Sequence, residues 1–203
     1  MTTGDSIDRG AASTRGIVEA LIFAADEPLS ARRIAGIVEE VTPGAVEDLV
    51  AELNATYLRE GRAFRIVSVA GGFRMVTRPE HALWIKLLHR SSRPRLSQAA
   101  LETLSIVAYR QPVTRTELEG IRGVNVDGVL KTLVERDLVR IAGRAEGLGR
   151  PLLYATTNRF LEYFGLPDLE ALPRPEEVEL APADETPQPD LFESEADAGD
   201  RQP

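Results

Sequence analysis

One segment occurs twice in the chain and decides the fold, first as Ala20-Leu-Ile-Phe-Ala-Ala-Asp-Glu-Pro-Leu-Ser30 and then as Leu104-Ser-Ile-Val-Ala-Tyr-Arg-Gln-Pro-Val-Thr114. Each version has an apolar helix end, two polar residues, a proline, an aliphatic residue and a hydroxyl residue. A proline disfavours helix at the residue before it, and serine or threonine is a preferred N-cap of a following helix. The segment therefore predicts a junction between two helices, present in two tandem copies.

The sequence that follows each copy extends the repeat. The second helix contains Arg33-Ile-Ala-Gly-Ile37 in one copy and Glu117-Leu-Glu-Gly-Ile121 in the other, and each is followed by a third helical pattern and a glycine-containing hairpin. Three helices and a hairpin are the plan of a winged-helix domain. The repeat is too long for a solenoid unit. We therefore expect a mainly helical α+β protein with two tandem winged-helix domains, small β-hairpin wings and a disordered acidic tail.

Composition places the boundaries of these parts. Polar and small residues at the start, the basic run Arg90-Ser-Ser-Arg-Pro-Arg95, and a proline- and acid-rich end are typical of segments that cannot bury enough apolar area to fold. The expected parts are a disordered N-terminus (1–14), winged-helix domain 1 for dimerisation (15–80), a connecting helix and basic linker (81–96), winged-helix domain 2 for partner binding (97–166) and a disordered tail (167–203).

Helical and strand periodicity predict the elements and their buried positions. Expected strands are 64–69, 73–77, 138–141 and 152–155, and expected helix caps are Ser30, Ser97, Thr114 and Asn158, with a capping box over 77–80. The helix positions expected to face a core are Ile17, Leu21, Ala24, Val46, Leu49, Val50, Leu53, Tyr57, Leu101, Leu104, Val107, Ala108, Val126, Val129, Leu130, Leu133 and Val134.

Charge and cysteine content limit the classes of function. The chain has 203 residues and a net charge of −8, but the part from Pro167 onward has twelve acidic and two basic residues, so the first 166 residues have a net charge of +2. The overall charge therefore excludes no partner, nucleic acid included. The absence of cysteine excludes disulfides and thiolate metal sites. The apolar run Ala20–Ala25 is too short to cross a bilayer.

The third helices are poor candidates for reading DNA. In the first copy the predicted solvent face includes Glu47, Asp48 and Glu52, which would repel phosphates. In the second copy the face has charges of both signs, which is typical of a solvated or protein-binding surface. The basic linker predicts at most weak DNA binding without sequence preference.

Catalytic and metal-binding chemistry have little support in the sequence. The two histidines, His81 and His89, lie eight residues apart on one short predicted helix with no carboxylate partner nearby. The glycines at 143, 147 and 149 precede a strand, so they are interpreted as wing-tip turn residues and not as a phosphate loop. We expect no enzyme activity, no cofactor and no metal.

Longer strings resemble a known family. Ala100-Leu-Glu-Thr-Leu-Ser-Ile-Val-Ala-Tyr-Arg-Gln-Pro-Val-Thr114, Ile121-Arg-Gly-Val-Asn-Val-Asp-Gly-Val-Leu130 and Gly149-Arg-Pro-Leu-Leu-Tyr-Ala-Thr-Thr-Asn-Arg-Phe-Leu-Glu-Tyr-Phe-Gly-Leu166 resemble the signature of bacterial segregation and condensation protein B. The first copy resembles the family more loosely, through Ile17-Val-Glu-Ala-Leu-Ile-Phe-Ala24 and Pro28-Leu29. Ala155 stands where the family pattern leads us to expect glycine.

The resemblance implies a non-catalytic, cytoplasmic and nucleoid-associated subunit of the bacterial condensin. Such proteins dimerise and bind the kleisin subunit, ScpA, which bridges the ATPase heads of the SMC protein. The candidate kleisin-binding residues lie at two turns on opposite ends of the second helix: Tyr109, Arg110, Gln111, Pro112, Arg122, Gly123 and Asn125. Capping and turn chemistry is the competing interpretation for each of them.

Two further questions stay open at the level of sequence. The single tryptophan, Trp84, is expected to pack the connecting helix onto a wing, and a dimer contact is the alternative. The function alternative to a condensin subunit is a winged-helix transcriptional regulator that binds DNA.

Overall fold

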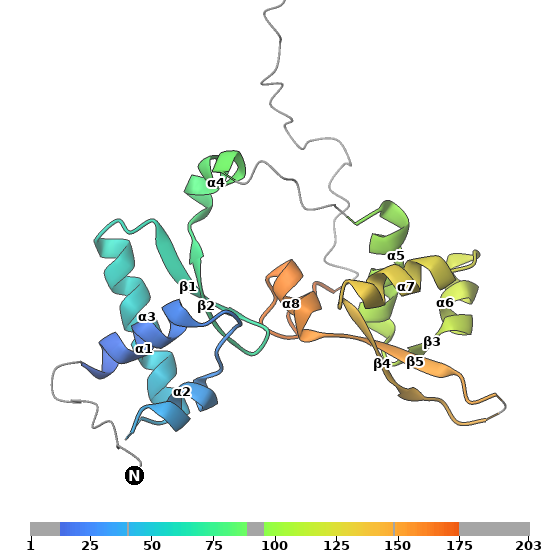
Figure 1. Ribbon diagram of the computed structural model, residues 1–203, viewed down its shortest axis with the longest axis horizontal. Coiled ribbons are helices and arrows are strands. Elements are labelled where there is room, and N and C mark those ends of the chain that lie inside the picture. Colours follow the sequence, from blue (N-terminus) through green and yellow to red (C-terminus); the bar gives the residue numbers. More distant parts are fainter. Residues whose placement is uncertain (1–12, 40, 89–95, 148, 175–203) are drawn as a thin grey trace, which may run out of the picture. The chain divides into compact units, whose positions relative to one another are not determined.

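Two separate hydrophobic cores organise the protein. The computed structural model describes residues 13–39, 41–88, 96–147 and 149–174 (Figure 1). The first core is built by α1 (Thr14–Ala24), α2 (Ala31–Ile37), α3 (Pro43–Arg59), β1 (Phe64–Val69) and β2 (Gly72–Thr77). A 3₁₀ turn, η1 (Pro79–His81), and the short helix α4 (Ala82–Leu88) follow these elements. The order of three helices and a hairpin is that of a winged helix.

The first core is closed by contacts between the helices and the hairpin. Its most buried side chains include Val18, Ile22, Ile34, Val46 and Leu53, each at most 2% exposed. β1 and β2 pair antiparallel, from Phe64 opposite Thr77 to Val69 opposite Gly72. A side chain at Gly72 would come within 2.8 Å of backbone atoms of Pro28 and Leu29, so glycine is required there.

The second core repeats this arrangement with a larger sheet. Its elements are α5 (Gln98–Arg110), β3 (Val113–Thr114), α6 (Arg115–Arg122), α7 (Asp127–Glu135), β4 (Val139–Arg144), β5 (Leu152–Thr156) and α8 (Asn158–Phe164). The strand order is β3-β5-β4, with antiparallel pairing and a shift in register between Ile141 and Gly143. The buried residues are Leu96, Ala100, Leu104, Val107, Ala108, Val113, Leu118, Val126, Leu130, Leu133, Leu138, Val139 and Phe160.

Much of the predicted local structure is confirmed. Ser30, Ser97 and Thr114 each accept a hydrogen bond from a backbone N–H of the first helical turn, as N-caps do. The winged-helix fold class is also confirmed. The predicted strands agree with those observed to within a residue at most ends, although β4 continues to Arg144. The two-residue strand β3 was not predicted, because a strand this short has no periodicity.

Several local predictions are wrong. Helix α1 begins at Thr14, with Ser13 as its cap, and its core residues are Val18 and Ile22, so the buried stripe is centred one residue further along than expected. The cap of α8 is Thr157, not Asn158, and Arg78 before η1 makes no side-chain cap. Three expected core residues are on the outer side of their helices, namely Ala24, Leu101 and Val134.

The ends of the chain and the linker are mostly outside the described residues. This applies to residues 1–12, to the linker over 89–95 and to the tail from 175, including the acidic run predicted to be disordered. The described chain packs against the second core as far as Leu172, beyond the predicted start of the tail at Pro167. In the part that the structure describes, none of the helices has the length and apolar character needed to cross a membrane.

Candidate partner-binding surface

The predicted site residues lie at the two ends of α6. Tyr109 and Arg110 end α5, Gln111 and Pro112 lead into β3, and Arg122 is the last residue of α6. Helix α6 has eight residues, so the two turns are on the order of 12 Å apart at 1.5 Å per residue. The structure thus places the two predicted turns on either side of one short helix.

The first turn combines an internal anchor with exposed side chains. The Gln111 side-chain oxygen accepts hydrogen bonds from the backbone N–H and the hydroxyl of Thr156, at 2.8 and 3.0 Å. Its amide nitrogen donates to the Ala108 carbonyl at 3.0 Å. Gln111 therefore joins the end of α5 to β5 and is not available as a partner contact. Tyr109 is 45% exposed, and Arg110 and Pro112 are also exposed.

Arg122 at the second turn is held inside the domain. Its guanidinium donates to the Ala99 carbonyl at 3.0 Å and to the hydroxyl of buried Thr103 at 3.2 Å, and it forms an ion pair with Glu102 at 2.9 Å. The side chain is only 14% exposed. The expectation of an exposed Arg122 is therefore wrong. Sequence alone missed this because the acceptors lie 19 to 23 residues away, on α5.

Gly123 and Asn125 shape the turn into α7. Gly123 has a φ of +68°, the left-handed conformation that glycine adopts at the end of a helix, and its N–H donates to the Glu119 carbonyl at 2.8 Å. The Asn125 side-chain oxygen accepts from the N–H of Asp127 at 3.0 Å. The turn-chemistry interpretation accounts for Gly123 completely and for part of Asn125.

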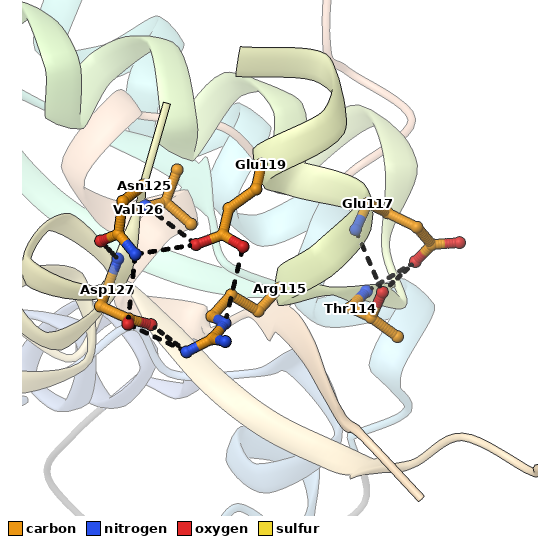
Figure 2. Close-up of polar contacts among 7 residues, drawn as sticks. All are labelled: Thr114, Arg115, Glu117, Glu119, Asn125, Val126 and Asp127. Atoms are coloured by element: carbon orange, nitrogen blue, oxygen red, sulfur yellow. Dashed lines mark hydrogen bonds and ion pairs between the residues drawn. The ribbon is translucent and has the colours of Figure 1, made fainter. Parts of the chain in front are cut away.

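A polar network joins the start of α6 to the start of α7 (Figure 2). The Arg115 guanidinium donates to both oxygens of Asp127, at 2.7 and 2.9 Å, and lies 3.8 Å from Glu119. The Asn125 amide donates to Glu119 at 3.1 Å. The hydrogen bond from Arg115, with a contribution from Asn125, holds the pKa of Asp127 below its usual value. Because Arg115 and Asp127 are about half exposed, the network fixes geometry more than it adds stability.

The capping box at the start of α6 is also complete. The carboxylate of Glu117 accepts from the backbone N–H and the hydroxyl of Thr114, both at 2.7 Å, and the Glu117 N–H donates to that hydroxyl at 3.3 Å. Hydrogen bonds from the Thr114 backbone and then its hydroxyl lower the pKa of the Glu117 carboxyl. Both ends of α6 are therefore fixed by specific hydrogen bonds.

Sequence reasoning missed the apolar side chains that this framework presents. Ile121 is 54% exposed and Val124 is 55% exposed, on either side of Arg122 and Gly123. We call Ile121, Val124 and Asn125 the α6–α7 corner. The signal for it was present, because Ile121 lies three positions after buried Leu118 and belongs to no apolar stripe of α6. Exposed aliphatic residues bordered by ordered polar groups are the composition of a protein-binding surface.

The other predicted features have mixed outcomes. Trp84 is 67% exposed and no residue of α4 is buried, so the expected packing of Trp84 on a wing is wrong. Glu47, Asp48 and Glu52 are exposed on α3, as expected. Among the described residues no three His, Cys, Asp or Glu side chains are grouped as metal ligands would be. His89 lies outside these residues.

The sequence matches one family over most of its length. Residues 16–175 match the family model for segregation and condensation complex subunit ScpB. The chain is 55% identical over 164 residues to segregation and condensation protein B of Moorella thermoacetica, covering 81% of this chain and 84% of that one. It is 47% identical over 186 residues to the protein of that name from Syntrophotalea carbinolica, covering 91% and 92%.

Solved structures are similar in sequence to parts of the chain. ScpB from Mycobacterium tuberculosis is 36% identical, with 75% of this chain and 95% of that chain covered and a TM-score of 0.36. A dimer of a ScpB N-terminal domain, complexed with ScpA peptide, is 37% identical, covers 39% of this chain and 92% of that one, and has a TM-score of 0.34. Since both TM-scores are low, the relationship rests on the sequence matches.

Proposed function

The chain belongs to the ScpB family of segregation and condensation complex subunits, and from this premise we propose that it binds the kleisin subunit ScpA and, through it, the SMC ATPase. In this role it is a non-catalytic scaffold of a bacterial condensin, located in the cytoplasm at the nucleoid. ATP hydrolysis and DNA entrapment belong to its partners. The observation that carries the proposal is the α6–α7 corner, where exposed aliphatic side chains stand on a rigid polar framework.

The kleisin contact is proposed to include both turns beside α6. Tyr109, Arg110 and Pro112 supply exposed groups at one turn, and the α6–α7 corner supplies Ile121, Val124 and Asn125 at the other. A helical or extended kleisin segment can use aliphatic anchors of this kind, with polar groups setting its direction. Gln111, Arg122 and Gly123 act by holding the two turns in place.

A matched pair of substitutions tests this surface. Ile121 and Ile37 occupy the same position in the two copies, and each is 54% exposed. Ile121→Ser should weaken binding of purified ScpA, measured by calorimetry, by roughly 30-fold, because removal of an interface anchor typically costs about 2 kcal/mol. Tyr109→Ala should weaken it as well. Ile37→Ser, in the first copy, should leave ScpA affinity unchanged.

The outcomes separate the surface from the function. If Ile121→Ser stays folded and binds ScpA as tightly as the parent, the α6–α7 corner is not the contact. A stronger effect of Ile37→Ser would move the contact to the first winged helix. If the parent chain does not bind ScpA at all, the proposed function itself is wrong.

We propose that the chain forms a homodimer through its first half. Helix α4 buries none of its residues, and four of its large apolar side chains are at least half exposed: Leu83, Trp84, Leu87 and Leu88. An apolar helix of this kind is stabilised by association. Light scattering of the full chain should give twice its mass of 22.2 kDa, and a Trp84→Ser, Leu88→Ser variant should dissociate at lower dilution. A monomeric parent at micromolar concentration would contradict the proposal.

The regulator alternative has less support. The exposed face of α3 has Glu47, Asp48 and Glu52, and the exposed face of α7 includes Asp127 and Glu135. Carboxylates on both third helices oppose insertion into a major groove. Reading of a DNA sequence by these helices is therefore not proposed.

A further inference from the structure

The second wing has an unusual charge. The hairpin formed by β4 and β5 has three arginines, Arg140, Arg144 and Arg150, all of them exposed, and one acidic residue, Glu146. The whole chain has a net charge of −8. This hairpin is therefore a local cationic surface on an acidic protein.

The wing arginines differ from other arginines of the same half of the molecule in their partners. Arg115, Arg122 and Arg159 each lie within 3.3 Å of a carboxylate oxygen. Among the residues that the structure describes, Arg140, Arg144 and Arg150 form no ion pair. An unpaired guanidinium on the surface keeps its five N–H donors available to an external anion.

Backbone hydrogen bonds hold two of these cations together at the tip. The Arg144 guanidinium donates to the Arg150 carbonyl at 3.2 Å, across the hairpin. The Ala145 N–H donates to the Pro151 carbonyl at 2.8 Å, and the Arg150 N–H donates to the Gly147 carbonyl at 3.3 Å. Positive charges kept close without a counter-charge repel each other, and an anion placed between them removes that repulsion.

The spacing of the cations fits an extended polyanion. Arg140 and Arg144 are four residues apart on β4, which at about 3.3 Å per residue is on the order of 13 Å along the strand. Figure 1 shows the β4–β5 hairpin extending past the helices of its own half, with the tip clear of α6 and α7. A row of cations on a projecting ribbon can follow a phosphate backbone, whose charges recur every 3.4 Å along each strand.

We propose that the β4–β5 wing binds the phosphate backbone of duplex DNA without reading its sequence. The hairpin's arginines contact phosphate oxygens, while the carboxylates on α7 keep that helix out of the groove. Because three contacts are few and the whole chain is acidic, binding is weak and depends strongly on salt. This site goes beyond the scaffold function and does not depend on ScpA binding.

The test uses two triple variants with the same net charge. Arg140→Gln, Arg144→Gln and Arg150→Gln together remove the wing cations. Arg32→Gln, Arg33→Gln and Arg59→Gln remove three exposed arginines of the first half that likewise have no ion pair in the described chain. Fluorescence anisotropy of a labelled 30-base-pair duplex, in two unrelated sequences, is measured with each full-length protein between 50 and 200 mM salt.

The wing variant should bind at least tenfold more weakly than the parent at the lowest salt, and its plot of log affinity against log salt should flatten by about 2 to 3, at roughly 0.9 per phosphate contact. The control variant should keep most of the parent's affinity, and both sequences should behave alike. Equal losses in both variants would show that only net charge matters. Parent-like binding by the wing variant, or no binding by the parent at 50 mM salt, would overturn the proposal.

Discussion

The two copies of the winged helix fasten their second helices in different ways. In the first copy Val38, only 7% exposed, follows α2 and packs in the core. The equivalent position of the second copy is Arg122, which fastens α6 to α5 by hydrogen bonds to Ala99 and Thr103 and an ion pair to Glu102. One copy therefore uses burial and the other uses polar geometry for the same junction.

The difference extends to the ends of these helices. Thr114 and Glu117 form a reciprocal capping box at α6, whereas Ser30 of α2 accepts one hydrogen bond, from Arg33. Helix α6 ends at Gly123 in a left-handed conformation, and α2 ends at a residue with extended backbone. Hydrogen bonds have directions and apolar contacts do not, so the second copy holds its exposed Ile121 in a more closely defined position than the first holds Ile37.

Removal of the polar fastening should give the largest effect on this comparison. Arg122→Ala should lower the free energy of unfolding by about 1–3 kcal/mol, because it breaks the hydrogen bonds between α5 and α6. Urea denaturation, with helical circular dichroism as the signal, measures this change. Arg110→Ala, an exposed arginine one turn away, is the control and should stay within about 0.5 kcal/mol of the parent. Equal stability of the two variants would mean that the polar junction contributes nothing.

A pair of glycines tests the end of α6. Gly123→Ala should lower the free energy of unfolding by about 1 kcal/mol, since the left-handed conformation at φ +68° strains any residue with a Cβ atom. Gly120→Ala lies inside the helix with open space around the added methyl group. It should raise stability by about 0.5–1 kcal/mol. The same denaturation experiment measures both, and effects of equal sign would contradict the assigned helix end.

The smallest expected effect depends on pH. The folded protein lowers the pKa of Glu117 from its usual 4.5. A lowered folded pKa gives stability that is present above the unfolded pKa and lost as pH falls through the folded one. The thermal midpoint of the parent should therefore exceed that of Glu117→Gln at pH 7, and the difference should shrink below about pH 4.5. A difference that is constant from pH 7 to pH 3 would show that the carboxylate charge is irrelevant.

Local features of the sequence were sufficient for much of the fold. The hydroxyl residues at 30, 97 and 114 cap the helices that they were predicted to cap, because a cap is decided within four residues. The helix periodicity also identified Val46, Val50, Leu53 and Tyr57 as the buried side of α3. It misplaced the stripe of α1 by one residue, since several adjacent positions of that helix are apolar and the pattern has no sharp edge.

The candidate surface was predicted only in outline. The repeated proline junction located the two turns at the ends of α6, and the family resemblance drew attention to them. The sequence could not separate structural residues from exposed ones, so Gln111 and Arg122 were counted as contacts. Their hydrogen-bond partners lie 45 and 19 to 23 residues away. No local pattern encodes such pairs.

The amino-acid sequence by itself determined the two winged helices, their order and most of their helix ends, because these depend on residues close together in the chain. The tertiary structure decided which polar side chains are used up inside the fold and which apolar ones remain exposed. Exposure depends on the packing of elements far apart in the sequence. For that reason Arg122 became part of the framework, and Ile121 and Val124, one residue to either side of the Arg122–Gly123 pair, became the surface.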